Sequence, residues 1–305
     1  MTRVLITGGS GFVALHAAEV ALARGHAVTL FDLSSPPAYA ARLAPGARHV
    51  QGDVRDRAAL AAAAEGASHV IHCAAVVGPA PAKADPTRAV EVNVVGTGNV
   101  LELARARGLP VVNLSTATLY GHRPGLEPLD ETAAPDPIGV YDATKLMAET
   151  LCTTYRRTFA VEVASIRTGF VFGHGSRIGE YFLQRVLRGE AIEEPCGADH
   201  SCDFTYVVDL ARGLVAAAEA GALPEPVYNV TTGVRRTRGD LAAAVRSLVP
   251  AAVIRQGPGV DPARHLRGAC LIARAHRDFG YAPRFTLETG LAHWLDRIRT
   301  LGPAA

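Results

Sequence analysis

Short apolar runs alternate, through the first half of the chain, with longer stretches in which alanine and leucine recur at helical spacing. Apolar runs of this length are typical of buried strands, and the longer stretches have the length and composition of helices. The expected strands are 3–7, 27–31, 69–75, 110–116 and 161–167. The expected helices are 13–25, 55–66, 87–108 and 141–159, with a loop rich in proline, glycine and acids at 122–139.

This alternation predicts the fold class. Strands separated by helix-length segments pair in parallel through right-handed crossovers, which indicates an α/β fold with a Rossmann-type doubly wound parallel sheet. After residue 168 the alternation weakens, and we expect the strand-like piece 203–209 to return towards the sheet. We predict a Rossmann domain of residues 1–168 plus about 203–229. We predict a smaller C-terminal substrate-binding lobe of residues 169–202 and 230–305.

Composition narrows the class of partner. Of the 305 residues, 49% are hydrophobic and 20% are charged, as in globular proteins, and the net charge is only +2. No basic block is present, so we expect neither nucleic acid nor a membrane as a partner, but a small-molecule substrate. The five cysteines form no CxxC pair, and the first strand begins too early for a signal peptide. We therefore expect reduced thiols, no membrane span and a cytoplasmic location.

A glycine-rich turn, TGGSGFVA at 7–14, directly follows the first expected strand and opens the first helix. Its glycines permit a tight turn and a close approach to a pyrophosphate, which helix amides then bind. Such turns also occur without a nucleotide, but Asp32 ends the second strand at the spacing of a ribose-binding acid. That acid would repel a 2′-phosphate, so NAD is favoured over NADP. The cofactor residues expected here are Gly8, Gly11, Phe12, Val13 and Asp32.

Tyr141 and Lys145 are the candidate proton-transfer residues. They are four positions apart at the start of an expected helix and therefore share one face. A cation beside a phenol lowers its pKa, which would suit Tyr141 to general acid/base catalysis. Most YxxxK pairs lie on solvated helix faces. The position of this pair, after the fifth strand of a Rossmann-type unit, favours a catalytic role.

Taken together, the motifs resemble those of the extended short-chain dehydrogenases/reductases, also called the NAD-dependent epimerase/dehydratase family. The resemblance extends over nearly the whole chain. The matching segments are TGGSGF (7–12), GDVRD (52–56), HCAA (72–75), VNVVGT (92–97), STATLYG (115–121), YDATK (141–145), IRTGFVFG (166–173), DFTYVVDLARG (203–213), VYNVTTG (227–233) and LETGLAHWL (287–295).

The resemblance implies a role for several residues. It implies adenine contacts at Asp53 and Val54, cofactor contacts at Ala74 and Ala75, and support of the active site by Asn93. It further implies that Thr116 holds the substrate oxygen, Tyr141 moves its proton and Lys145 also binds the nicotinamide ribose. The helices at 87–108 and 141–159 would pair across a two-fold axis in a homodimer.

Three functions remain open. The first is an NAD-dependent oxidoreductase that moves a hydride at a secondary alcohol or ketone, with Tyr141 as acid/base. The second is a nucleotide-sugar 4-epimerase with tightly bound NAD and no net redox change. The third, a catalytically silent dinucleotide-binding regulatory protein, is disfavoured because Tyr141 and Lys145 are both present.

Family members that eliminate water or carbon dioxide usually have an acid after the catalytic hydroxyl residue, and here Ala117 and Thr118 follow it. Dehydratase and decarboxylase activities are therefore disfavoured.

The substrate contacts depart from the pattern of nucleotide-sugar enzymes. Phe170 replaces a frequent asparagine, Cys202 replaces a frequent arginine, and the late arginines Arg264 and Arg267 stand in another register. Phosphates need fixed cations, so we favour a sugar-like or polyhydroxylated substrate without a nucleotide, although Arg177, Arg264 or Arg267 could compensate. The expected substrate residues are Thr118, Phe170, Cys202, Arg264 and Arg267.

A local cluster of metal-ligand types, Cys196, His200 and Cys202, lies within seven residues. Its spacing matches no common zinc motif, and we expect a substrate-lobe loop and no metal. We expect His122 and His174 to lie in loops near the mouth of the pocket.

Overall fold

The central sheet has seven parallel strands, in the computed structural model that describes residues 2–176 and 180–302. In sheet order they are β11 (Val227–Asn229), β6 (Val163–Arg167), β5 (Val111–Leu114), β4 (His69–His72), β1 (Arg3–Thr7), β2 (Ala27–Asp32) and β3 (Arg48–Gln51). The chain runs outward from β1 to β3 and then returns to the other side of β1 as β4. The doubly wound order is confirmed, and its switch point lies between β1 and β4.

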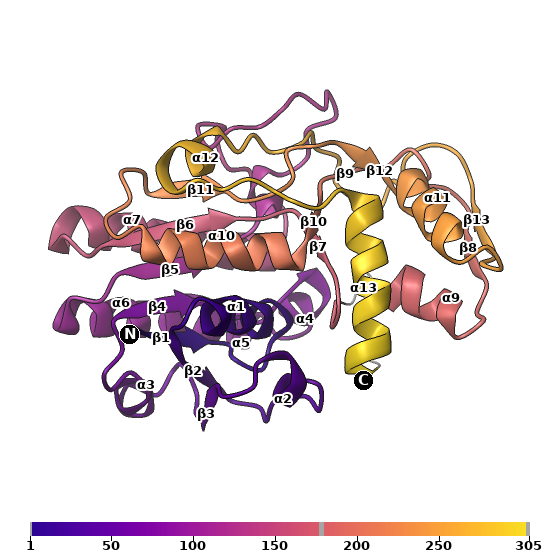
Figure 1. The fold of residues 1–305 in the computed structure, drawn as a ribbon. Coiled ribbons are helices and arrows are strands. Elements are labelled where there is room, and N and C mark those ends of the chain that lie inside the picture. The colour runs from indigo at the N-terminus through magenta and orange to yellow at the C-terminus, as the bar shows by residue number, and fades with distance from the viewer. Residues whose placement is uncertain (1, 177–179, 303–305) are drawn as a thin grey trace.

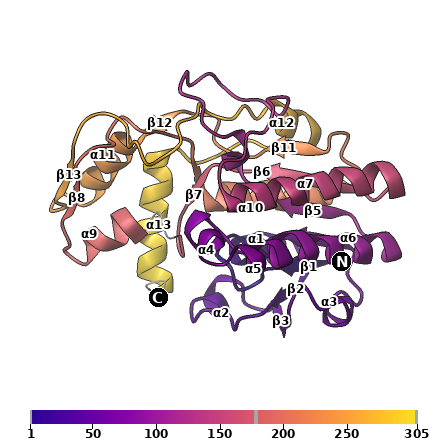
Figure 2. The same cartoon turned by 180° about the vertical axis from the view of Figure 1, so that it is seen from behind.

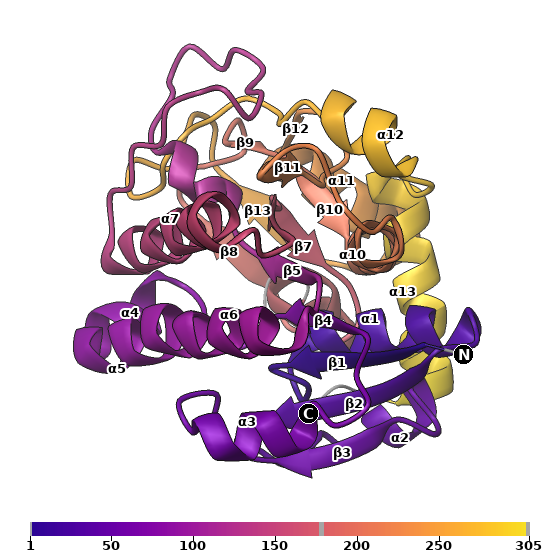
Figure 3. The ribbon, with the colours of Figure 1, turned by 90° about the vertical axis from the view of Figure 1, so that its left-hand side faces the viewer.

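Helices cover both faces of the sheet (Figures 1 and 2). One face carries α1 (Phe12–Ala23), α2 (Ala40–Leu43), α10 (Val207–Glu219) and α12 (Ala273–Phe279). The other carries α3 (Arg57–Ala63), α4 (Pro79–Ala84), α5 (Pro86–Val90), η1 (Glu91–Val95), α6 (Gly96–Arg107) and α7 (Val140–Phe159). Figure 3 shows the three layers, with α6 and α7 on one side of the strands and α1 and α10 on the other. The η1 segment is a π-helical turn between α5 and α6.

The strands are apolar because both of their faces are covered. Val70 and Ile71 of β4 are fully buried, one beneath each helix layer. Adjacent residues of a strand point to opposite faces, so a strand buried on both sides reads as a continuous apolar run. This is why β1, β2, β4, β5 and β6 are recognisable in the sequence.

A second apolar core lies beyond the carboxyl ends of the strands. Its large buried side chains include Phe172, Phe182, Tyr206 and Trp294. Helix α13 stands beside this end of the sheet and is drawn in yellow in Figure 1. The elements around this core are β7 (Phe170–Phe172), η3 (Glu180–Gln184), α9 (Arg185–Leu187), β8 (Ile192–Glu194), β9 (Ser201–Cys202), β10 (Phe204–Tyr206), β12 (Arg236–Thr237), α11 (Arg238–Leu248), β13 (Ile254–Gln256) and α13 (Leu287–Leu301).

Two features differ from the sequence prediction. The piece 203–209 does not join the large sheet: residues 204–206 pair with β7 in a separate two-stranded sheet, and α10 begins at Val207. The strand that joins β6 is β11. Strand β3 was also missed, because only Val50 among its four residues is apolar and none is fully buried. No helix in the described part of the chain is long and apolar enough to cross a membrane.

Candidate active site

The glycine turn lies at the switch point of the sheet. Gly8 has φ +68°, and a Cβ there would lie 2.7 Å from the backbone nitrogen of Ala74, just after β4. The turn closes with a hydrogen bond of 2.9 Å from the Gly11 amide to the Gly8 carbonyl oxygen. Only glycine combines this backbone conformation with so close an approach of the neighbouring chain. The turn therefore leaves the backbone accessible to a ligand at the start of α1.

The residues here fit a dinucleotide. Helix α1 begins after Gly11 with no acid in its first turn, and no side chain of residues 2–176 and 180–302 caps it, so its first amides are available to a pyrophosphate. The side chains of Phe12 and Val13 are half-buried against the second core, which leaves their backbone amides as the groups facing the turn. Asp32, at the end of β2, accepts hydrogen bonds from the amides of Ser10 (3.1 Å) and Ser34 (2.8 Å). Its half-buried carboxylate is thus held beside the turn, where a ribose would lie.

The expected adenine contacts differ in their surroundings. The Asp53 carboxylate is bound by the Arg55 guanidinium, which holds its pKa below the usual range. Val54 is buried, and a Cβ added at Gly96 would lie 2.6 Å from its Cγ1, so its side chain packs inward. Ala74 and Ala75 are half-buried after β4.

Lys145 and Thr116 meet at the carboxyl end of β5. The Lys145 side chain is buried, and its Nζ donates a 2.6 Å hydrogen bond to the Leu114 carbonyl oxygen. Burial lowers the pKa of this amine. Thr116 follows two residues after Leu114 and caps the short helix η2 (Ala117–Tyr120). Tyr141 lies in the first turn of α7, the helix that contacts η2 at this strand end.

The pKa of Tyr141 is shifted in the direction opposite to our expectation. Burial raises it, and the charge of Asp142 raises it further, while the neighbouring Thr116 lowers it. Lys145 is not among the groups that shift this pKa, and its amine donates to the Leu114 carbonyl oxygen. The expectation that Lys145 lowers this pKa is therefore wrong for the arrangement in this structure.

A chain of hydrogen bonds, absent from the sequence prediction, starts at Thr116. Its Oγ1 lies 3.0 Å from Thr118 Oγ1, and the Thr118 hydroxyl donates a 2.5 Å hydrogen bond to Asp142 Oδ1. Asp142 is buried, and its other oxygen accepts the Gly139 amide at 3.2 Å. Thr118 was expected to contact substrate. In this structure its hydroxyl donates to Asp142, and the substrate contact stays a prediction.

Asn93 connects two segments of the site from within the π-helical turn. Its amide nitrogen donates to the carbonyl oxygen of Val76 (3.2 Å) and to Thr144 Oγ1 (2.9 Å), and its oxygen accepts the Val76 amide (2.7 Å). The Thr144 hydroxyl in turn donates to the Tyr141 carbonyl oxygen at 2.8 Å. Asn93 is fully buried, so it supports the loop after β4 and the first turn of α7 together. π-helical turns are frequently found at functional sites.

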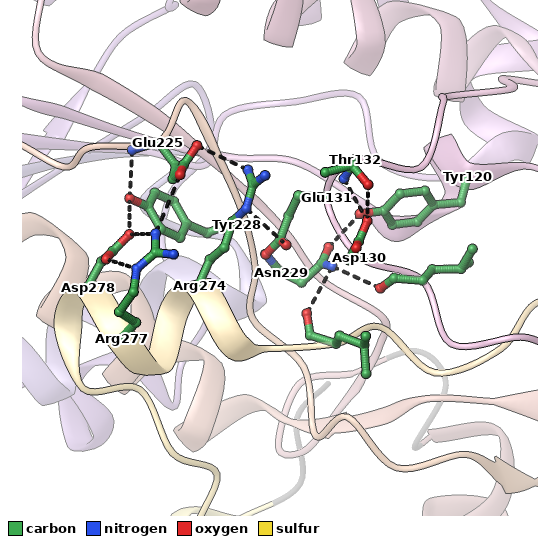
Figure 4. Close-up of polar contacts among 12 residues, drawn as sticks. Tyr120, Asp130, Glu131, Thr132, Glu225, Tyr228, Asn229, Arg274, Arg277 and Asp278 are labelled. Atoms are coloured by element: carbon green, nitrogen blue, oxygen red, sulfur yellow. Dashed lines mark hydrogen bonds and ion pairs between the residues drawn. The ribbon is translucent and has the colours of Figure 1, made fainter.

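A polar network fastens the chain after β5 to β11 and α12 (Figure 4). The buried Tyr120 hydroxyl donates to Asn229 Oδ1 at 2.8 Å, and the backbone N–H of Asn229 donates to Glu131 Oε1 at 2.8 Å. The Glu131 carboxylate lies 3.6 Å from Arg274, and burial raises its pKa. Tyr120 therefore has a structural role: its hydroxyl is completely buried, and a buried hydroxyl needs a hydrogen-bond partner.

The expected substrate residues fall into three environments. Phe170 packs beside Phe204, and Cys202 is buried in the second core. Arg264 is exposed and pairs with Asp261 at 2.8 Å. Arg267 is only 9% exposed, and its Nε has no hydrogen-bond partner among the described residues. Arg177 lies outside the described residues.

The remaining candidates do not form a metal centre. No group of three ligand-type side chains able to hold a metal was found in residues 2–176 and 180–302. His200 is buried, and neither of its ring nitrogens has a hydrogen-bond partner in the described part of the chain. His122 is exposed and accepts the Leu266 amide. His174 is fully buried against Tyr39, so its expected place at the mouth of the pocket is wrong.

Comparisons with known proteins agree with this geometry. Residues 4–231 match the model of the NAD dependent epimerase/dehydratase family. UDP-glucuronate 4-epimerase 2 of Arabidopsis thaliana is 28% identical over 323 residues, covering 94% of this chain and 74% of that protein. UDP-glucuronic acid decarboxylase 1 of Danio rerio is 29% identical over 302 residues, covering 95% and 71%. The crystal structure of Thermus thermophilus UDP-glucose 4-epimerase in complex with NAD superposes with a TM-score of 0.84 at 29% identity, covering 98% of this chain and 99% of that one.

The chain therefore belongs to the NAD-dependent epimerase/dehydratase family, and the resemblance stated from its motifs is confirmed. The relatives include both epimerases and a decarboxylase, so family membership leaves the reaction to be decided by the site.

Proposed function

We propose that this protein is an NAD-dependent enzyme that oxidises a secondary alcohol of an anionic, sugar-like substrate and reduces the resulting ketone in the same site, as a nucleotide-sugar 4-epimerase does. The observation that supports this most is the convergence of Thr116, Tyr141 and Lys145 at the end of β5, opposite the glycine turn at the switch point. The site thus combines a hydroxyl for the substrate oxygen with a proton carrier.

The side chains have separate roles in this reaction. Bound NAD would accept a hydride from the carbinol carbon and return it. Tyr141 takes the proton of the substrate hydroxyl when the alcohol is oxidised and gives it back to the carbonyl oxygen on reduction. Thr116 holds that oxygen, and Lys145 binds the nicotinamide ribose. The amides at the start of α1 and the Asp32 carboxylate hold the pyrophosphate and the adenosine ribose.

We propose that elimination of water or carbon dioxide is not part of the reaction. Such steps need a second acid or base beside the neighbouring carbon. Ala117 and Thr118 have no ionisable group, and both oxygens of the nearby Asp142 carboxylate are engaged, by Thr118 and by the Gly139 amide. Because decarboxylases are also among the relatives, this exclusion must be tested by experiment.

Arg267 supports an anionic substrate. Burying a guanidinium is costly unless an anion pairs with it, and the Nε of this one has no partner among the described residues. A diphosphate or a carboxylate supplies such an anion. The buried guanidinium therefore favours a substrate that carries an anion, whereas the sequence alone favoured a substrate without a nucleotide.

The test is to incubate the protein with UDP-glucose, UDP-glucuronate and the corresponding free sugars. Products are identified by NMR, and NADH is followed by its absorbance. An epimer without accumulating NADH supports the proposal, whereas stoichiometric NADH indicates a net dehydrogenase. A decarboxylated or deoxygenated product overturns the exclusion of elimination. Arg267→Leu should raise KM for the anionic substrate by about 10- to 100-fold, with the exposed Arg264→Leu as the matched control.

We also propose a homodimer. The helices α5, η1 and α7, which belong to the layer shown in Figure 2, carry five exposed large apolar side chains: Val90 (40%), Val95 (52%), Val140 (37%), Met147 (49%) and Phe159 (45%). Exposed apolar side chains gathered on one face are typical of an interface. Light scattering should give twice the monomer mass, and Val95→Glu with Met147→Glu should reduce it. A monomeric wild type would contradict the proposal.

A further inference from the structure

Residues 264–271, which we call the strap, lie along the loop of residues 122–139 and contain Arg267. Three backbone hydrogen bonds join the strap to the loop. They run from the Arg123 amide to the Leu266 carbonyl oxygen (2.6 Å), from the Leu129 amide to the Ala269 carbonyl oxygen (2.9 Å) and from the Leu271 amide to the Leu129 carbonyl oxygen (2.8 Å). The two segments are thus paired along most of the strap.

Gly268 lies at the closest approach of the strap to the loop. A Cβ added there would be 2.1 Å from the carbonyl oxygen of Glu127 and 2.6 Å from that of Leu126. Both atoms belong to the backbone, so no side-chain rotation makes room for a Cβ, and one of the two segments would have to move. Gly268 is not among the glycines with positive φ, so this position needs glycine for space and not for backbone conformation.

The loop is itself fastened to the segment that follows Thr116. Its two ends are joined where the Asp136 amide donates to the Leu119 carbonyl oxygen at 2.8 Å. The Arg123 guanidinium holds it further by donating to the Tyr120 carbonyl oxygen at 2.9 Å. Leu119 and Tyr120 belong to η2, the short helix that Thr116 caps. The loop therefore has a fixed place relative to Thr116.

Asn229 of β11 holds the same parts together from a second side (Figure 4). Its side-chain nitrogen donates to the carbonyl oxygens of Leu129 in the loop (3.3 Å) and Leu271 in the strap (3.1 Å). Its oxygen accepts the hydroxyl of Tyr120 in η2 at 2.8 Å. One fully buried side chain thus fixes the strap, the loop and η2 relative to one another.

Arg267 directly precedes Gly268 and has a fixed backbone with an unsatisfied side chain. The buried Ser201 hydroxyl donates to the Arg267 carbonyl oxygen at 2.8 Å. The Arg267 side chain is buried, and its Nε has no hydrogen-bond partner in residues 2–176 and 180–302. A held backbone with a buried donor left free suits a group that receives an anion.

We propose that Gly268 is a positioning residue: by letting the strap rest directly on the loop, it sets the distance between the Arg267 guanidinium and the Thr116 hydroxyl. The inference rests on the proposed function, in which Arg267 binds the anion of the substrate and Thr116 holds the reacting oxygen. That distance fixes how far apart these two groups of the substrate must be. Gly268 thereby selects the length of the substrate without touching it.

The test compares UDP-glucuronate with the shorter glucuronate 1-phosphate in the NAD-loaded protein. Affinity is measured by calorimetry, and turnover is followed by NMR. Gly268→Ala should weaken UDP-glucuronate binding by about 10-fold and reduce its preference over glucuronate 1-phosphate. NAD affinity should stay unchanged, and KM should rise more than kcat falls. Gly125→Ala is the matched control in the same loop, because its new Cβ would meet only the mobile carboxylate of Glu127.

Ser201→Ala is a second variant for the case in which Gly268→Ala does not fold. It removes the hydroxyl that holds the Arg267 backbone and should weaken UDP-glucuronate binding in the same way. If Arg267→Leu weakens binding but neither of these variants does, the inference is overturned and the proposed function stands. Equal losses of NAD and substrate affinity in Gly268→Ala would show a merely structural role and also overturn it. Unchanged binding in Arg267→Leu, or no binding by the wild type, refutes the proposed anion site and the inference with it.

Discussion

The Lys145 amine lies 2.6 Å from the carbonyl oxygen of Leu114 and donates a hydrogen bond to it. This contact joins the first turns of α7 to the last residue of β5, two positions before Thr116. A buried ammonium is thus kept within the pocket by one backbone acceptor. The role proposed for Lys145, binding the nicotinamide ribose, starts from this position.

Lys145→Met should separate stability from function. The buried amine loses hydration, and its hydrogen bond offsets that cost, so replacement by an apolar side chain of similar length should change the free energy of unfolding by less than about 1 kcal/mol. NAD affinity and turnover should both fall, because the ribose contact is lost. Denaturant unfolding and NAD titration measure the two effects. A strong loss of stability with normal turnover would contradict this role.

Tyr141→Phe and Tyr120→Phe should behave in opposite ways. Loss of a general acid/base lowers kcat by about 10²- to 10⁴-fold, while NAD binding should persist. Tyr120→Phe removes a buried hydrogen bond to Asn229, so it should cost about 1–3 kcal/mol in the free energy of unfolding with little effect on kcat. Steady-state kinetics and urea unfolding of both variants check the contrast. Equal losses of kcat in the two variants would contradict the assignment of a catalytic role to Tyr141 and a structural role to Tyr120.

Gly8→Ala should be far more damaging than Gly25→Ala. Both glycines have positive φ, +68° and +82°, so each substitution carries a backbone cost of about 1–2 kcal/mol. Only at Gly8 would the new Cβ also meet the backbone of Ala74, at 2.7 Å, whereas nothing lies within 4 Å at Gly25. Melting temperature and NAD affinity should fall in Gly8→Ala. Gly25→Ala should lower only the melting temperature, and loss of NAD binding there would refute the argument.

Stability should decrease as the pH falls below about 6.5. His72 is buried between the hydroxyls of Thr7 and Thr97, and burial lowers its pKa to about 3. Between pH 6.5 and 3 the unfolded chain binds a proton that the folded imidazole does not, which costs about 1.4 kcal/mol per pH unit. Urea unfolding at a series of pH values should show a smaller slope for His72→Gln than for wild type.

Much of the fold could be predicted because its strands are buried on both faces. Val70 and Ile71 show how such a strand becomes a continuous apolar run, and Gly8 marks a turn that few other residues could form. Strand β3 could not be predicted, because an edge strand with polar residues has no continuous apolar run. The piece 203–209 has the composition of a strand, but its last residues complete the first turn of α10.

The candidate site was predictable in its residue types and less so in its electrostatics. The pair Tyr141 and Lys145 has a helical spacing that brings both to one face, yet the spacing does not say that the amine turns to Leu114. Asp142 stands beside Tyr141 in the sequence, where an acid at a helix start ordinarily indicates a cap. That its second oxygen reaches Thr118 depends on how β5 and α7 pack, which no local pattern contains.

The π-helical turn at Glu91–Val95 makes function depend on the number of residues in the continuous helix α5–η1–α6. A π turn accommodates one residue more than an α turn, so a chain shortened by one residue here could continue as ordinary α-helix with its apolar face intact. The helical segments before and after the deletion would keep their orientation, because only the wide turn that carries Asn93 would be removed. Such a protein could fold and still bind NAD, yet the Asn93 side chain would no longer span from Val76 to Thr144. The sequence position most easily deleted without unfolding the helix is therefore one of those least able to tolerate deletion in an active enzyme.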